Sequence, residues 1–194
     1  MNKFKEEENQ FLLRIFSEAL QSASKAFSQL LHKPVKVDFL ELRNEIPFQV
    51  LLDSENELYY NLTTSVKGEL LAKSYLIFHH KDAEHLMKCC FSDKDYSQKE
   101  LEEFLLEIDN ILSASVVSKL ADFLKKFIYG YVPQLQYERG NLLYQSIFDE
   151  QHSWEITLSL HSVFLIEEIY ISPIFIWNFS SEFVQEIINN LHSK

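Results

Sequence analysis

Two long stretches with helical periodicity constrain the fold of this chain more than any other feature. In residues 8–31, apolar side chains recur every three or four positions, which is the spacing that places them on one face of a helix. The same spacing runs through residues 98–128, and Ser97 followed by Glu100 forms a capping-box pattern at the start of that stretch. We therefore predict two long amphipathic helices, each with one buried face.

Segments rich in β-branched and aromatic residues follow each of these helices, and this composition favours strands. The predicted strands are residues 35–42, 48–53, 57–65, 69–78, 142–148, 154–160 and 164–176. A short helix over residues 81–91 closes the first group of strands, and a helix over 181–191, with Ser180 as its N-cap, closes the second. Each half of the chain therefore has the same order of elements.

The two long helices can also be aligned with each other. With Glu18 placed opposite Glu107, Gln21 falls opposite Asn110 and the apolar positions stay in phase. Two unrelated amphipathic helices would also look somewhat alike, so the shared order of elements is the stronger evidence for a duplicated unit.

Together these patterns predict an α+β fold with pseudo-twofold symmetry. One domain covers residues 1–194, and its related halves span about 1–91 and 92–194. Two long helices then pack against an antiparallel sheet, because each helix has a single apolar face to bury.

Composition and charge argue against several classes of function. The chain has only three glycines, and it contains neither of the glycine-rich loop motifs that bind nucleotide phosphates. Its formal charge of −11 disfavours binding to nucleic acid, which depends on clustered lysine and arginine. An acidic chain should instead prefer a protein partner with an exposed basic patch. For most of the negative charge, however, we favour the simpler interpretation that it keeps a soluble protein in solution.

The sequence predicts a cytoplasmic protein without membrane insertion. Its first residues lack the apolar core of a secretory signal. The most apolar stretch, residues 163–179, is interrupted by two glutamates and a proline, whereas a membrane span needs about 20 predominantly apolar residues. The two cysteines, Cys89 and Cys90, are neighbours and do not suggest a disulfide framework, which fits a reducing compartment.

Glu107 and Asn110 form the most informative pair of polar residues. They lie three positions apart in the second long helix, so both side chains leave the same face about one turn apart. Neither is a strong nucleophile, and an amide cannot accept a proton. One can bind a cation while the other holds a water, which suits a site that completes the chemistry of another molecule. Without further context, such a pair is usually just a solvated helix face.

The surroundings of this pair resemble the CheC/CheX/FliY family of chemotaxis phosphatases. The family pattern is Asp or Ser, three residues, Glu, two residues, Asn, twenty-two residues and Pro. This chain has Glu103, Glu107, Asn110 and Pro133 at those places. The segment EIDNILSASVVSKLADFL is similar to the family's site helix, and HHKDAEHLMKCCF is similar to the short helix before it.

Three departures from the family pattern stand out. Glu103 replaces the first Asp or Ser, and Asp109 stands where the family often has glycine. We expect Asp109 to add bulk and charge beside the site. The first helix offers Glu18 and Gln21 but no asparagine, which predicts a degenerate second site. One intact site resembles the CheX arrangement more than the two-site CheC arrangement.

The resemblance implies a phosphatase that hydrolyses the aspartyl phosphate of a CheY-like response regulator. The regulator would supply the divalent metal ion, so the chain needs no metal or cofactor of its own. Glu107 would anchor the regulator's lysine. Asn110 would orient the attacking water, a task that suits an amide because it both donates and accepts hydrogen bonds. A CheD-like protein or a second copy of the chain is a further partner that the family suggests.

Two other interpretations are open. The same helix could dock a partner without catalysis, as a binding or scaffold module of a chemotaxis or two-component signalling complex, and a crowding Asp109 would favour this. His80, His85 and Cys89 could approach one another, but zinc would need a fourth ligand and the sequence offers no second spaced pair. Exposure of both Glu107 and Asn110 would keep catalysis open, whereas burial of either would favour the binding module.

Overall fold

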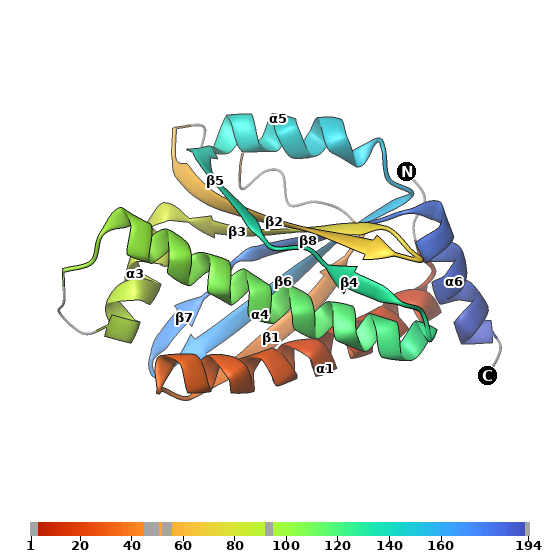
Figure 1. The fold of residues 1–194 in the computed structure, drawn as a ribbon, viewed down its shortest axis with the longest axis horizontal. Helices are drawn as coiled ribbons and strands as arrows, with labels where there is room; N and C mark the ends of the chain where they lie inside the picture. The colour runs from red at the N-terminus through yellow and green to blue at the C-terminus, as the bar shows by residue number, and fades with distance from the viewer. Residues whose placement is uncertain (1–3, 45–50, 52–55, 92–94, 193–194) are drawn as a thin grey trace.

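The computed structural model describes residues 4–44, 51, 56–91 and 95–192. These residues form one antiparallel sheet with helices on both faces (Figure 1). The helices are α1 (Glu6–Leu31), α3 (His80–Phe91), α4 (Gln98–Leu124), α5 (Gly140–Gln151) and α6 (Ser181–His192). The strands are β1 (Val35–Arg43), β2 (Leu58–Gly68), β3 (Ala72–His79), β4 (Ile128–Gly130), β5 (Gln134–Arg139), β6 (Ile156–Ile166), β7 (Ile169–Ile171) and β8 (Ile174–Phe179). The predicted α+β class, with long helices on an antiparallel sheet, is confirmed.

The order of strands across the sheet is symmetric between the halves of the chain. The sheet runs β1-β6-β8-β3-β2-β4, with β5 also pairing with β2 and β7 with β6. Strands β3 and β8 meet at the centre, and each is flanked by a strand of its own half. Beyond them, β1 of the first half pairs with β6, while β4 and β5 of the second half pair with β2. Each half therefore completes the sheet of the other, which supports the predicted pseudo-twofold unit.

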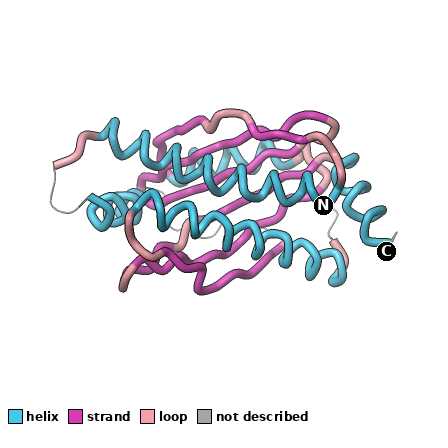
Figure 2. The backbone as a smooth tube through the Cα atoms, turned by 60° about the horizontal axis from the view of Figure 1, so that its bottom comes forward, coloured by secondary structure: helices cyan, strands magenta, loops and turns pink. Residues whose placement is uncertain are grey.

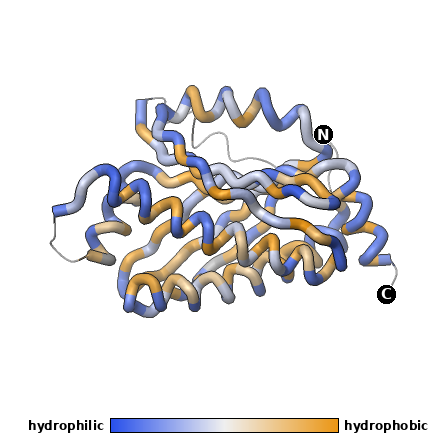
Figure 3. Tube along the Cα trace, viewed as in Figure 1, coloured by the Kyte–Doolittle hydropathy of each residue, from blue (hydrophilic) through white to orange (hydrophobic). Residues whose placement is uncertain are grey.

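Helices α1 and α4 lie side by side on one face of the sheet and run in opposite directions (Figure 2). The rings of Phe11, near the start of α1, and Phe123, near the end of α4, are 4.3 Å apart. Their buried faces share the large core with the sheet. In Figure 3 hydrophobic segments of the strands alternate with paler, more polar ones, and α4 alternates between hydrophilic and hydrophobic turns. The helix pair thus has one face against the sheet and one face toward the outside.

When α1 and α4 are aligned with Glu18 opposite Glu107, buried positions of one helix fall opposite buried positions of the other. Seven aligned pairs of apolar residues are buried on both sides: Leu12 and Leu101, Ile15 and Phe104, Phe16 and Leu105, Ala19 and Ile108, Ala23 and Leu112, Phe27 and Val116, Leu31 and Leu120. The polar residues Glu18, Gln21, Glu107 and Asn110 are all exposed. Equivalent faces are therefore buried in the two halves. The division of the chain near residue 91 stays a prediction.

The opposite face of the sheet is covered by α5, where the sequence predicted a strand over 142–148 (Figure 1). That prediction is wrong because the apolar residues of this segment suit both structures. Leu143 and Ile147 are four residues apart and both are buried against a small cluster on β2, β3 and β8. A helix places both residues on one face. Only the packing of that face against the sheet decides between a helix, with a period of about 3.6 residues, and a strand, with a period of two.

Other differences concern the ends and number of strands. Helix α4 stops at Leu124, where Lys125 adopts a left-handed conformation, and Ile128 already belongs to β4. Strands β4 and β5 were not predicted. Strand β6 continues through the gap predicted at 161–163, whereas 164–176 is divided among β6, β7 and β8. The strand predicted over 48–53 lies outside the described residues, apart from Leu51. No helix in the described part of the chain combines the length and hydrophobicity that crossing a bilayer requires.

Candidate functional site on helix α4

The start of α4 is held by the capping box that the sequence predicted. The Ser97 hydroxyl accepts a hydrogen bond from the Glu100 backbone N–H at 3.3 Å, and the Glu100 carboxylate accepts one from the Ser97 backbone N–H at 2.7 Å. The bond from the Ser97 backbone also holds the pKa of Glu100 below its usual value. The first turn of the site helix is therefore fixed by local interactions.

Burial divides α4 into an inner and an outer face. Leu105, Ile108 and Leu112 are buried against the core, with at most 4% of their surface exposed. Glu107 and Asn110 are exposed on the outer face, together with Ala114 one turn later. Val117, seven residues after Asn110, is buried at 5% exposure and lies where α4 faces β4.

The two predicted site residues are available to a partner. Both side chains lie on the exposed face of α4, and a spacing of three residues keeps them one turn apart. Within the part of the chain that the structure describes, no hydrogen bond or ion pair joins either side chain to another residue. The exposure that keeps catalysis open is therefore present.

The outer face of α4 continues beyond Asn110 as a shallow groove. Its floor is formed by short side chains of α4 and by the adjacent strand β4, and its volume is about 330 Å³. The lining residues are Ala114, Val117, Ser118, Ala121, Asp122, Ile128, Tyr129 and Gly130. The surface next to Asn110 is therefore low enough for another protein to approach closely.

Asp109 does not crowd this surface, so the expectation drawn from the sequence is wrong. Its side chain is completely buried. The hydroxyl of Thr64 on β2 donates a hydrogen bond to one carboxyl oxygen at 2.7 Å, and the hydroxyl of Ser113 donates to the other at 3.0 Å. Residues advance by about 100° around a helix, so neighbours can face opposite sides. Burial raises the pKa of Asp109 to about 6, partly offset by these two hydrogen bonds.

Thr64 and Ser113 were missed by the sequence analysis. Ser113 is four residues after Asp109, a spacing that could have suggested a bond within the helix. Thr64 is 45 residues away from Asp109 in the chain. No sequence signal links these two, because their contact depends on where α4 lies across β2.

The two residues that flank the motif lie in different elements. Glu103 is exposed one turn before Glu107 and pairs with Lys99 at 3.5 Å on the surface. Pro133 is buried between β4 and β5, both of which pair with β2. A proline has no N–H for a ladder hydrogen bond, which suits this interruption of the edge strand. Pro133 therefore shapes the strand segment beside the α4 groove and is not itself part of the exposed face.

The first helix presents its polar pair differently. Glu18 and Gln21 are exposed on α1, but the Glu18 carboxylate lies 3.4 Å from the ammonium group of Lys119 on α4. The Gln21 side-chain amide donates a hydrogen bond to the Ser17 hydroxyl at 3.5 Å. The Glu18 carboxylate is thus already paired with a cation of the same chain. This supports the prediction of a degenerate second site, which stays a prediction.

Among the described residues, His80, His85 and Cys89 of α3 belong to no cluster of metal-binding side chains. Nowhere among the described residues do three or more histidine, cysteine or acidic side chains gather closely enough to hold a metal ion. His80 lies 3.3 Å from Glu84 and 3.0 Å from the Tyr137 hydroxyl. Burial raises the pKa of the Cys89 thiol, which disfavours the thiolate that a cysteine nucleophile requires.

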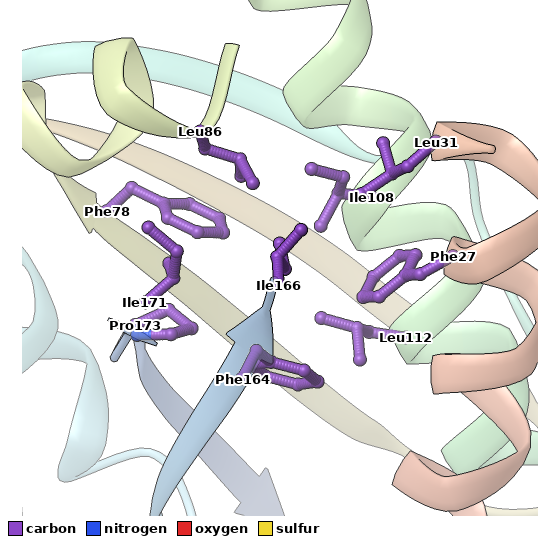
Figure 4. Close-up of a pocket in the computed structure, with 10 residues that line it drawn as sticks. All are labelled: Phe27, Leu31, Phe78, Leu86, Ile108, Leu112, Phe164, Ile166, Ile171 and Pro173. Atoms are coloured by element: carbon purple, nitrogen blue, oxygen red, sulfur yellow. The ribbon is translucent and has the colours of Figure 1, made fainter. Parts of the chain in front are cut away.

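A small cavity lies under the site helix, between the two long helices and the sheet (Figure 4). Its volume is about 20 Å³, and its lining is entirely apolar: Phe27, Leu31, Phe78, Leu86, Ile108, Leu112, Phe164, Ile166, Ile171 and Pro173. Ile108 and Leu112 reach it from the inner face of α4. A space of this size holds no drug-sized ligand, so the candidate site is the outer face of the helix.

Comparison with other proteins gives a result at the level of structure only. No protein-family model matches the chain, and no curated protein sequence matches it significantly. FliY from Thermotoga maritima superposes with a TM-score of 0.72 at 15% identity, covering 100% of both chains. The chemotaxis protein CheX from Vibrio vulnificus gives a TM-score of 0.56 at 12% identity, covering 86% of this chain and 99% of its own.

The flagellar protein FliM is also similar in structure. The FliM middle domain from H. pylori gives a TM-score of 0.56 at 12% identity, covering 96% of this chain and 99% of that domain. Identities this low establish the arrangement of elements and leave the chemistry open. The chain therefore has the fold that FliY, CheX and CheC-like proteins share, and the resemblance first seen in the α4 motif is confirmed at the level of the fold.

Proposed function

We propose that the outer face of α4 docks on a phosphorylated CheY-like response regulator and accelerates hydrolysis of its aspartyl phosphate. The observation that carries this proposal is the exposure of Glu107 and Asn110 on one helix face, beside a shallow groove. The fold shared with CheX and FliY supports it.

The proposed chemistry divides between the two proteins. The regulator brings the phosphoryl group, its lysine and a divalent metal ion. The Glu107 carboxylate binds that lysine and sets the docking register. The Asn110 carboxamide reaches the phosphoryl group and holds a water in line with the bond to be broken. The water attacks phosphorus and the bond to the aspartyl oxygen breaks. The regulator's carboxylate is released, and the inorganic phosphate leaves with the two protons of the water.

Positioning is sufficient for this task because phosphoryl transfer needs little covalent help from the protein. Well-oriented intramolecular reactions gain about 7–11 kcal/mol from positioning in ideal cases. One amide that orders one water has to supply only a small part of that range. An amide is suited to this because its oxygen accepts and its N–H donates.

The charge of the chain fits a basic partner. Its formal charge is −11, and Glu103 and Glu107 project from the outer face of α4, with Asp122 beside the groove. Complementary charge raises association rates and fixes orientation more than it raises affinity. Docking of a lysine-bearing surface should therefore be fast at low salt and slower at high salt.

A second candidate function is a non-catalytic binding module of a chemotaxis or two-component signalling complex. The observation that favours it is the similarity to FliM, one structure of which shows FliM in complex with SpeE. The exposed face of α4 would serve docking equally well without catalysis. A CheD-like protein or a second copy of the chain is a further candidate for such a partner.

The deciding experiment measures phosphate release from regulators of the same genome, phosphorylated with a small acyl phosphate, with and without this chain. Acceleration above self-hydrolysis supports the phosphatase. Binding of a regulator without acceleration, measured in parallel by calorimetry, supports the binding module. If no regulator binds and none is dephosphorylated faster, the phosphatase proposal is wrong, and a binding module remains only for a partner other than a regulator.

A further inference from the structure

The buried carboxylate of Asp109 forms a directed link between the site helix and the sheet. Most of α4 is held by apolar contacts with the core, and such contacts are not directional. The hydrogen bond from Thr64 to Asp109, 2.7 Å long and fully buried, joins the middle of α4 to β2. A second polar link, from Gln98 to the Tyr60 hydroxyl at 3.0 Å, lies in the first turn, eleven residues earlier. Asp109 is thus the tether nearest to the candidate site.

The direction of this tether bears on Asn110 because the two residues are adjacent. A side-chain tip lies about 5–6 Å from the axis of its helix. A rotation of α4 by about 10° would therefore move the Asn110 carboxamide by about 1 Å, and a misplacement of that size can reduce a reaction rate by about 100-fold. A hydrogen bond at Asp109 that resists rotation of α4 therefore limits the displacement of the neighbouring Asn110 carboxamide.

The equivalent position in the first half of the chain holds an apolar residue. In the alignment of the long helices, Leu20 of α1 corresponds to Asp109, and both side chains are completely buried. Ser24 corresponds to Ser113, and both are buried. The position thus holds a leucine in α1, where Glu18 is paired within the chain. It holds a carboxylate in α4, which carries Glu107 and Asn110. Packing alone does not explain Asp109.

We propose that Asp109 is a positioning residue: its hydrogen bond to Thr64 fixes the rotation of α4 and thereby holds Glu107 and Asn110 in the orientation that the partner requires. Asp109 does not touch the partner. The effect of Asp109 on catalysis rests on the proposed function. The restraint on rotation of α4 does not, because it concerns this chain alone.

Two variants remove the tether in different ways. Asp109→Leu copies the residue found at the equivalent position of α1, so the fold has a precedent for it. Thr64→Val removes only the hydroxyl that donates the bond. Asp109→Asn is the conservative variant, because its amide oxygen still accepts the Thr64 bond. Thr157→Val is the matched control: Thr157 is also buried and donates a 2.7 Å bond to the side chain of Asn178, but on strand β6 rather than to α4.

The first readout is kcat and KM for phosphate release from the phosphorylated regulator by the full chain. Asp109→Leu and Thr64→Val should lower kcat/KM by about 10- to 100-fold, within the range expected for a misplacement of about 1 Å. Asp109→Asn should retain most of the activity, and Thr157→Val should match the wild type. Wild-type kcat and KM in folded Asp109→Leu and Thr64→Val would overturn the role in catalysis.

The second readout needs no activity. NMR relaxation dispersion detects exchange between conformations on the microsecond to millisecond timescale. Backbone amides of residues 106–113 should show exchange in Asp109→Leu and Thr64→Val, but not in the wild type, Asp109→Asn or Thr157→Val. Absence of exchange in both tether variants would overturn the rotational restraint. A wild-type chain that accelerates no hydrolysis would overturn the proposed function, yet the exchange pattern would still decide the restraint.

Discussion

Asp109 and Asn110 are adjacent in α4 but face opposite sides of it. The Asp109 side chain is buried on the inner face and accepts a hydrogen bond from Thr64 of β2, whereas the Asn110 side chain is exposed on the outer face. The pair shows how one helix can serve two purposes at neighbouring positions. The inner residue ties the helix to the sheet, and the outer residue is left open to a partner. The predictions below separate these two purposes by measurement.

Asn110→Ala should lower kcat for dephosphorylation of the regulator by about 100-fold, the size of effect seen when one preorganised hydrogen-bonding group is removed. Binding of the regulator should change little, because alanine leaves the docking surface intact. The measurement is steady-state phosphate release together with calorimetric affinity. Gln21→Ala, which removes the aligned amide on α1, is the control and should behave as wild type. Equal loss in both variants would contradict the assignment to α4.

Glu107→Gln should raise KM more than it lowers kcat, because it removes the charge that binds the regulator's lysine but keeps the shape of the side chain. Wild-type KM should increase with salt, and the variant should show a weaker dependence, since screening acts on an exposed charge pair. Glu18→Gln removes the same amount of charge from α1, where Lys119 already pairs with it. If Glu18→Gln changes the salt dependence equally, net charge rather than Glu107 is responsible.

Asp109 should make the stability of the chain depend on pH in a predictable direction. Its pKa rises from the ordinary 3.8 to about 6 in the folded state, so the folded chain binds this proton more tightly than the unfolded chain does. The contribution of Asp109 to the free energy of unfolding is therefore largest below about pH 4. It declines as pH rises through about 6, by roughly 3 kcal/mol at about 1.36 kcal/mol per pKa unit.

Urea unfolding of the wild type and of Asp109→Leu over about pH 4 to 8 checks this prediction. The stability of the wild type relative to the variant should fall between about pH 4 and 6 and level off above about 7. Other titrating groups are common to both proteins and largely cancel in the difference. A difference that stays constant over the whole range would show that the pKa of Asp109 is not raised.

Gly68 should be sensitive to substitution because its backbone has a φ of 118°, a conformation that L side chains rarely adopt. A Cβ atom added there would also overlap the carbonyl oxygen of Phe127, next to the end of α4. Gly68→Ala should lower the free energy of unfolding by about 2 kcal/mol, as expected for local backbone strain. The measurement is chemical denaturation of the full chain.

Gly130→Ala provides the matched comparison for Gly68→Ala. Gly130 lies in β4 beside the same strand, and its added Cβ would meet only the Thr64 side chain, at 3.3 Å. Gly130→Ala should lower the free energy of unfolding by less than Gly68→Ala does, because the methyl group of Thr64 can move by a few tenths of an ångström. Equal losses in the two variants would show that neither the positive φ of Gly68 nor the overlap with the Phe127 carbonyl makes this position the more sensitive one.

The long helices were predictable because their evidence is local. The apolar spacing of α1 and α4 and the Ser97–Glu100 capping box act over a few residues, and local interactions leave a readable pattern in the sequence. The same periodicity placed Glu107 and Asn110 together on the outer face. The end of α4 was harder to predict, because Lys125 takes up a left-handed conformation without the glycine that usually marks such an end.

Segments whose apolar residues suit two structures could not be assigned without the rest of the fold. Residues 142–148 became part of α5 because Leu143 and Ile147 bury together against the sheet. Strand β4 has only three residues and exists because β2 offers it an edge. In both cases the deciding contacts come from distant parts of the chain.

The sequence by itself determined the two amphipathic helices and the E-x-x-N pair one turn apart, because both follow from spacing along a single helix. It also determined the α+β class, because helix-like and strand-like segments differ in composition and periodicity. Only the tertiary structure decided the exchange of strands between the halves, the burial of Asp109 and the pairing of Glu18 with Lys119. Those features depend on which residues, tens of positions apart, meet when α1 and α4 settle on the sheet. Local spacing along the chain therefore predicts which face of a helix a residue occupies, but not which distant residue it contacts.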